Sequence, residues 1–130
     1  MAVTALSGPL SNLLLAFLFV VMWLATYAAG LAGTFADILE KFLLISAQIN
    51  VSLCLFNLIP LPPLDGEKII AIFLPEQAEL FLQRNAMMFQ LIIMFLLFTS
   101  ILTGPLSTLM GNVLRNMVTI ANLFFHLQLA

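Results

Sequence analysis

The chain has 130 residues, of which 63% are hydrophobic and only 8% are charged, and its formal net charge is −2. Soluble domains carry about 25% charged residues, so this composition is typical of a membrane protein and excludes an ordinary soluble domain. Four basic residues are too few for a nucleic-acid-binding face or a polybasic lipid-binding patch. The single cysteine, Cys54, excludes a disulfide framework. We expect one domain over residues 1–130.

Residues 10–29 are the first predicted membrane span. The segment is uncharged and has the length of about 20 residues that a helix needs to cross the hydrocarbon core. Gly8 and Pro9 are expected to mark its start, because proline interrupts the hydrogen bonding of a helix interior. Trp23 and Tyr27 lie toward its other end, where amphipathic aromatic rings favour the membrane interface.

Residues 42–59 are the second predicted span, and this segment is unusually polar for lipid. Its polar side chains are Ser46, Gln48, Asn50, Ser52 and Asn57. At about 100° per residue they fall on two nearly opposite arcs, with Gln48 and Ser52 together on one of them. Polar groups on both sides are poorly satisfied in lipid, so we expect a central helix with protein or a water-filled cavity on each side. The alternative is that Ser46, Gln48 and Ser52 serve only as interhelical hydrogen-bond partners.

The segment 60–66 follows the second span and cannot be regular helix throughout. Pro60, Pro62 and Pro63 lack backbone donors and disfavour helix in the residues before them. Asp65 places a carboxylate at or near the depth of the bilayer, which is costly and therefore indicates a function. The structural alternative is a capping residue in an ordinary turn.

The remainder of the chain predicts three further segments. Residues 69–84 read as a surface or interfacial helix, residues 86–103 as a third uncharged span, and residues 107–129 as an interfacial or partly embedded amphipathic helix. The string Gly-Pro-Leu-Ser occurs at 8–11 and 104–107, where we expect two helix boundaries. The predicted fold class is all-α: a polytopic transmembrane helix bundle with about three spans and a C-terminal amphipathic helix.

The basic residues predict an orientation in the membrane. Lys41 lies before the second span, whereas Lys68 and Arg84 both lie between the second and third. Cytoplasmic loops carry an excess of Lys and Arg, so the loop with Asp65 is expected to face the cytoplasm, on a difference of one charge.

The segment that begins at Asn57 carries a resemblance to a known family. Asn57, Pro60, Pro63, Asp65 and Gly66 fit the pattern N-x-x-P-x-x-P-x-D-G at every fixed position. This pattern resembles the second signature of the site-2 protease family of intramembrane zinc metalloproteases. The segment 5–12, Ala-Leu-Ser-Gly-Pro-Leu-Ser-Asn, is similar to the Gly-Pro segment that family members carry after their first signature. The resemblance covers most of the chain.

The resemblance implies an activity and a role for each residue of the signature. The family cleaves peptide bonds of transmembrane substrates with a zinc ion held by two histidines of an H-E-x-x-H helix and one carboxylate. By this resemblance Asp65 is the third metal ligand and Asn57 contacts the substrate or the developing oxyanion. Pro60, Pro63 and Gly66 set the geometry of the loop. For Asn57 a structural cap at the end of the span remains the alternative.

The sequence departs from the family in one respect, because it contains no H-E-x-x-H. His126 is its only histidine and has no neighbouring glutamate, so we do not expect it to replace the family's ligands. The first signature would lie upstream of Gly8. We therefore expect a C-terminal portion of a longer enzyme, inactive and without tight zinc binding until it is joined to an H-E-x-x-H segment. The alternatives are a non-catalytic scaffold or pseudoprotease that binds transmembrane partners and, more remotely, a small transporter subunit.

Overall fold

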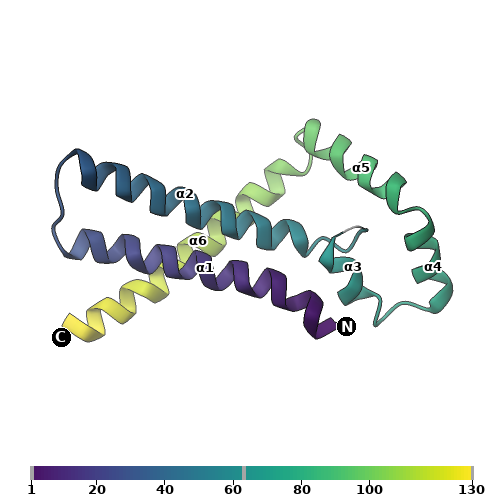
Figure 1. The fold of residues 1–130 in the computed structure, drawn as a ribbon, viewed down its shortest axis with the longest axis horizontal. Coiled ribbons are helices and arrows are strands. Elements are labelled where there is room, and N and C mark those ends of the chain that lie inside the picture. Colours follow the sequence, from purple (N-terminus) through teal and green to yellow (C-terminus); the bar gives the residue numbers. More distant parts are fainter. Residues whose placement is uncertain (1, 63, 130) are drawn as a thin grey trace.

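The chain is helical, which confirms the all-α prediction. The computed structural model describes residues 2–62 and 64–129, and every regular element in these ranges is a helix. The helices are α1 (Ala2–Ala28), α2 (Thr34–Asn57), α3 (Asp65–Ile70), α4 (Glu76–Arg84), α5 (Ala86–Phe98) and α6 (Thr103–Leu129). The long helices α1 and α2 lie antiparallel, α6 crosses them, and α3, α4 and α5 lie toward the end that carries the N-terminus (Figure 1).

Small side chains form the centre where α1, α2 and α6 meet. Ala16, Ala47 and Ala121 come one from each helix, and each is 0% exposed. Val20 and Val51 complete the contact between α1 and α2. Small residues let helix backbones approach closely, which is how helices associate in lipid, where apolar burial gives little driving force. These three helices are therefore the packed body of the molecule.

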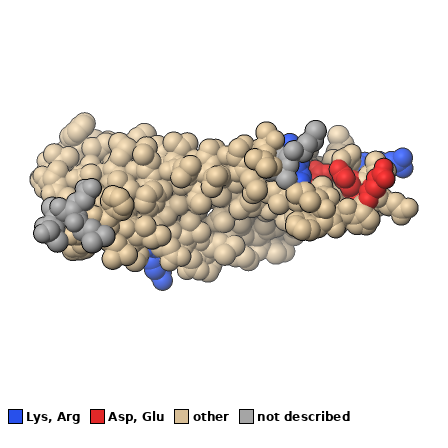
Figure 2. Space-filling view, turned by 90° about the horizontal axis from the view of Figure 1, so that it is seen from below, with Lys and Arg blue, Asp and Glu red and all other residues tan. Residues whose placement is uncertain are grey.

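Two helices have the length and composition to cross a membrane, and a bent pair of helices could form a third span. Val3–Ala28 and Thr34–Asn57 qualify singly, and α4 with α5 qualifies only as a pair that is bent by 68°. At 1.5 Å per residue the 13 residues of α5 reach about 20 Å, short of the roughly 30 Å of the hydrocarbon core. On the face drawn in Figure 2 most of the surface is uncharged, and charged side chains gather at the end of the molecule where α3 and α4 lie.

The first helix begins earlier than residue 10, where the sequence predicts its start. Pro9 lies inside α1, which runs unbroken from Ala2. Pro9 has no amide N–H to donate to the Ala5 carbonyl four residues earlier, yet α1 continues through it. The hydroxyl of Ser11 donates to the Gly8 carbonyl at 2.8 Å, and that of Ser7 donates to the Thr4 carbonyl at 2.6 Å. The proline is thus a local feature within a span.

The predicted third span, residues 86–103, is interrupted before its end. α5 stops at Phe98, and Ser100 adopts a left-handed conformation with φ 60°. Gly104 and Pro105, expected to end the span, instead lie in the first turn of α6, where a proline needs no amide donor. The Ser107 hydroxyl donates to the Gly104 carbonyl at 2.7 Å, so the repeated tetrapeptide makes the same local hydrogen bond at both of its positions.

The predicted interfacial helix over 69–84 is two helices. α3 already begins at Asp65, so the last two residues of the predicted irregular segment are helical. Pro75 is the N-cap of α4 and has an extended backbone conformation. Because a proline disfavours helical conformation in the residue before it, the chain cannot continue α3 through Leu74 into α4. The result is a short helix at the end of α2 and a second one beyond it.

Candidate functional site

Asp65 is the first residue of α3 and lies where the loop after α2 returns to helix. Its side chain is 35% exposed, so the carboxylate is half-buried. The Lys68 ammonium lies 3.8 Å from Oδ1, one turn further along α3, and its side chain is 62% exposed. An ion pair this open to solvent contributes little to stability. One carboxylate oxygen is thus directed toward a lysine at the surface of the molecule.

The other carboxylate oxygen is directed at α1. A Cβ atom built on Gly8 would lie 3.1 Å from Asp65 Oδ2. α3 packs along α1, so this proximity belongs to a helix–helix contact. The fold therefore brings together the Gly-Pro segment and the Asp-Gly segment, which the sequence presented as two separate matches.

Gly66 is buried against the end of α2. A Cβ atom at this position would lie 2.5 Å from the Leu58 carbonyl oxygen and would collide with the carbonyl oxygen of Ile59. Both are backbone atoms, so they cannot rotate out of the way. Only glycine permits this close approach, which holds the start of α3 onto the end of α2.

The loop between α2 and α3 is held by short-range backbone hydrogen bonds. The Leu61 amide donates to the Ile59 carbonyl at 2.8 Å, and the Leu64 amide donates to the Leu61 carbonyl at 2.9 Å. Pro62 is fully buried, whereas Pro60 is exposed. Pro63, a predicted determinant of the loop geometry, lies outside the described residues. These two hydrogen bonds hold the described part of the loop in tight turns.

The other candidate residues, Asn57 and His126, form no cluster with Asp65 that could hold a metal ion. Asn57 is the last residue of α2 and is half-buried. His126 is exposed near the C-terminal end of α6, which lies at the opposite end of the molecule from α3 (Figure 1). Among the residues that the structure describes, no three His, Cys, Asp or Glu side chains come together in a group that could hold a metal ion. These residues alone do not fit a zinc site, because such sites use three or four protein ligands.

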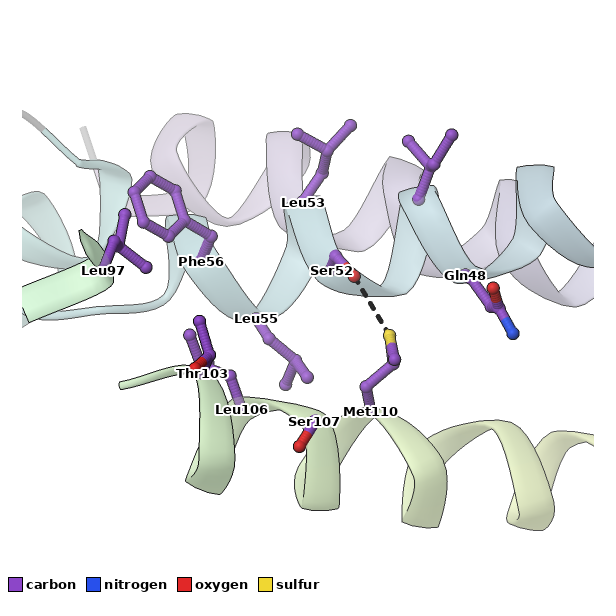
Figure 3. A pocket seen from close by; sticks show the side chains of 11 residues that line it. Gln48, Ser52, Leu53, Leu55, Phe56, Leu97, Thr103, Leu106, Ser107 and Met110 are labelled. Atoms are coloured by element: carbon purple, nitrogen blue, oxygen red, sulfur yellow. Dashed lines mark hydrogen bonds between the residues drawn. The ribbon is translucent and has the colours of Figure 1, made fainter. Parts of the chain in front are cut away.

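A cavity of about 560 Å³ lies between α2, the end of α5 and the start of α6 (Figure 3). Gln48 and Ser52 line it from α2, and the Ser52 hydroxyl donates to the Met110 sulfur at 3.1 Å. Its lining contains no ionisable side chain, and Asp65 is not part of it. One polar arc of the second span therefore does face a cavity. The opposite arc includes Asn50, whose amide donates to the Ser46 carbonyl of its own helix at 2.9 Å.

Comparison with known proteins identifies the family. Residues 25–101, more than half of the chain, match the model of peptidase family M50. The chain belongs to peptidase family M50, the site-2 proteases. The matched region contains the whole Asn57–Gly66 segment and leaves Gly8 outside, so the assignment does not depend on the Gly-Pro segment.

Two curated relatives resemble this M50 chain in part. Over 73 residues, 55% of the chain, it is 42% identical to the Bacillus subtilis protein named "Putative zinc metalloprotease YwhC". Over 66 residues, 51% of the chain, it is 38% identical to "Putative zinc metalloprotease MJ0611" of Methanocaldococcus jannaschii. The matches cover 33% and 31% of these relatives, so the chain spans about a third of their length. No solved structure matches.

The sequence predicts Asp65 and Gly66 as site residues but does not predict that Gly8 lies beside the Asp65 carboxylate. The sequence presents the Gly-Pro segment as a second match to the family and predicts a helix boundary at Gly8. A glycine placed directly before a proline in an otherwise apolar span was the available signal, because both residues weaken a helix interior. The contact partner could not be predicted, since it lies in a segment far along the chain.

Proposed function

We propose that this chain supplies the third metal ligand and the substrate-binding loop of an intramembrane zinc metalloprotease, with Asp65 as the ligand. The observation that carries the proposal is the match to peptidase family M50 across the segment that holds Asp65. Further support comes from the position of the carboxylate, half-buried between α3 and α1 at the end of two apolar helices. A carboxylate near the bilayer is costly, so such a group typically marks a functional site.

The remaining metal ligands, in this proposal, are two histidines of an H-E-x-x-H segment outside these 130 residues. Carboxylate oxygen and imidazole nitrogen are both ordinary zinc ligands, and a catalytic site uses three of them. Without the histidines the chain is expected to bind zinc weakly. Asn57 is proposed to contact the substrate or its oxyanion, while Pro60, Pro63 and Gly66 hold the loop that presents Asp65.

The proposed setting is a multi-pass membrane protein that acts on a transmembrane protein substrate. The length and apolar composition of α1 and α2 support contact with lipid. The loop with Asp65 is proposed to lie toward the cytoplasm, where Lys68 and Arg84 would satisfy the positive-inside rule.

Joining the chain to an H-E-x-x-H segment tests this proposal. Purified in detergent, the 130 residues alone are expected to leave a transmembrane peptide substrate intact. The chain joined at its N-terminus to the H-E-x-x-H segment of an M50 protease is expected to cleave that substrate, and a zinc chelator should stop the cleavage. Zinc-dependent cleavage by the isolated 130 residues would contradict the proposal. So would a well-folded joined protein that shows no cleavage, a result that favours the non-catalytic scaffold.

A further inference from the structure

We propose that Gly8 is a positioning residue for the Asp65 carboxylate: its missing side chain leaves the space on α1 that Oδ2 requires. The inference rests on the proposed function in one respect, since the group being positioned is the proposed metal ligand. Gly8 lies outside the segment that matches the M50 family, whereas Asp65, which it is proposed to orient, lies inside that segment.

The surroundings of Gly8 support a role specific to this carboxylate. Apart from its two chain neighbours and the nearby backbone of its own helix, Asp65 Oδ2, at 3.1 Å, is the one described atom within 4 Å of the position that a Gly8 Cβ would occupy. Few Cβ contacts in proteins are this short, so a methyl group there would force the oxygen to move. Outside α1 itself, the effect of a methyl group at Gly8 should therefore pass through Asp65 and through no other described residue.

The backbone of Asp65 cannot readily retreat from such a side chain. Its neighbour Gly66 already lies against the carbonyl oxygens of Leu58 and Ile59 at the end of α2. A close-packed backbone contact of this kind resists displacement. With α3 held in place, the carboxylate can yield only by rotating about its own side-chain bonds. A methyl group at Gly8 would thus change the direction in which Oδ2 points.

Glycine at position 8 lowers the intrinsic stability of α1, so its presence there requires another reason. Glycine and proline are the two poorest residues for a helix interior, and α1 carries them consecutively as Gly8 and Pro9. Gly111 of α6 is a useful contrast, because, apart from its chain neighbours and its own helix backbone, a Cβ built there would meet no described atom within 4 Å. Alanine at Gly111 should fit its helix freely, whereas alanine at Gly8 should not.

The carboxyl resonances of the two aspartates provide a direct test. The chain contains only Asp37 and Asp65, so labelling the side-chain carboxyl of aspartate with ¹³C gives two signals, which an Asp37→Asn variant assigns. In micelles of the full chain, Gly8→Ala is expected to shift the Asp65 resonance and to leave that of Asp37 in place. Gly111→Ala should shift neither. An Asp65 resonance that moves no further in Gly8→Ala than in Gly111→Ala would overturn the inference.

A thermal double-mutant cycle tests the same contact with a larger side chain. Gly8→Val is expected to lower the Tm of the full chain, and truncation by Asp65→Ala should recover most of that loss, because it removes the oxygen that the valine meets. Gly111→Val is the matched control, and it should change the Tm by the same amount with Asp65 present and with Asp65→Ala. An equal Tm loss from Gly8→Val with and without the carboxylate would overturn the inference. Neither experiment involves zinc, so failure here is distinct from failure of the proposed function.

Discussion

Replacement of Asp65 by asparagine in the joined, H-E-x-x-H-containing protein is expected to reduce zinc-dependent cleavage at least about 100-fold. Loss of groups that merely support a metal ligand costs about 10–100-fold in affinity or activity, so loss of a ligand should cost no less. The measurement is kcat/KM for a transmembrane peptide substrate at a zinc concentration that saturates the parent protein.

Asp37→Asn is the control for this experiment. Asp37 lies in the first turn of α2, at the other end of that helix from the loop with Asp65. Its replacement removes the same charge from the chain and should leave kcat/KM within about twofold of the parent, as for a surface change away from the site. If the two variants were equally active, Asp65 would have no special role.

Replacement of Gly66 by alanine is expected to destabilise the fold by about 3 kcal/mol. The new methyl group would collide with the carbonyl oxygens of Leu58 and Ile59, and neither can rotate away because both belong to the backbone. The end of α2 and the start of α3 would have to separate. The free energy of unfolding in detergent, compared with that of the parent, measures this effect.

Gly111→Ala gives the matched comparison for Gly66→Ala. Both replace a helical glycine by alanine, but the space around Gly111 is open. The control is expected to stabilise α6 by up to about 1 kcal/mol, the usual preference of a helix interior for alanine. Equal stability of the Gly66→Ala variant and the parent would show that the contact between the loop and α2 is loose.

Composition and local pattern predicted the helices that carry the site. The uncharged segment 10–29 predicts α1 except for its start, which lies at Ala2. The apolar run before Pro60 predicts the C-terminal end of α2 within two residues, whereas its start lies at Thr34 and not at residue 42. The two polar arcs of α2 predict protein or a water-filled cavity on each side of this helix, and Gln48 and Ser52 do line a cavity. These features are set by residues close in sequence, so the sequence alone reveals them.

The features that escaped prediction depend on tertiary structure or on unusual local backbone. Pro9 resembles a helix boundary but lies inside α1, where serine hydroxyls bond to backbone carbonyls close to it. Ser100 adopts a left-handed conformation that no sequence pattern demands of a serine. The proximity of Gly8 to Asp65 joins two helices across the fold, and periodicity along one helix carries no information about its partner.

The zinc content of the joined protein tests the role of Asp65 most directly. Purified from zinc-containing medium and dialysed, the parent should retain about one zinc ion per chain by atomic spectroscopy. The Asp65→Ala variant, shown by circular dichroism to be folded, should lose nearly all of it, and Asp37→Ala should keep it. A folded Asp65→Ala protein with the full complement of zinc would contradict the assignment of this carboxylate as a metal ligand.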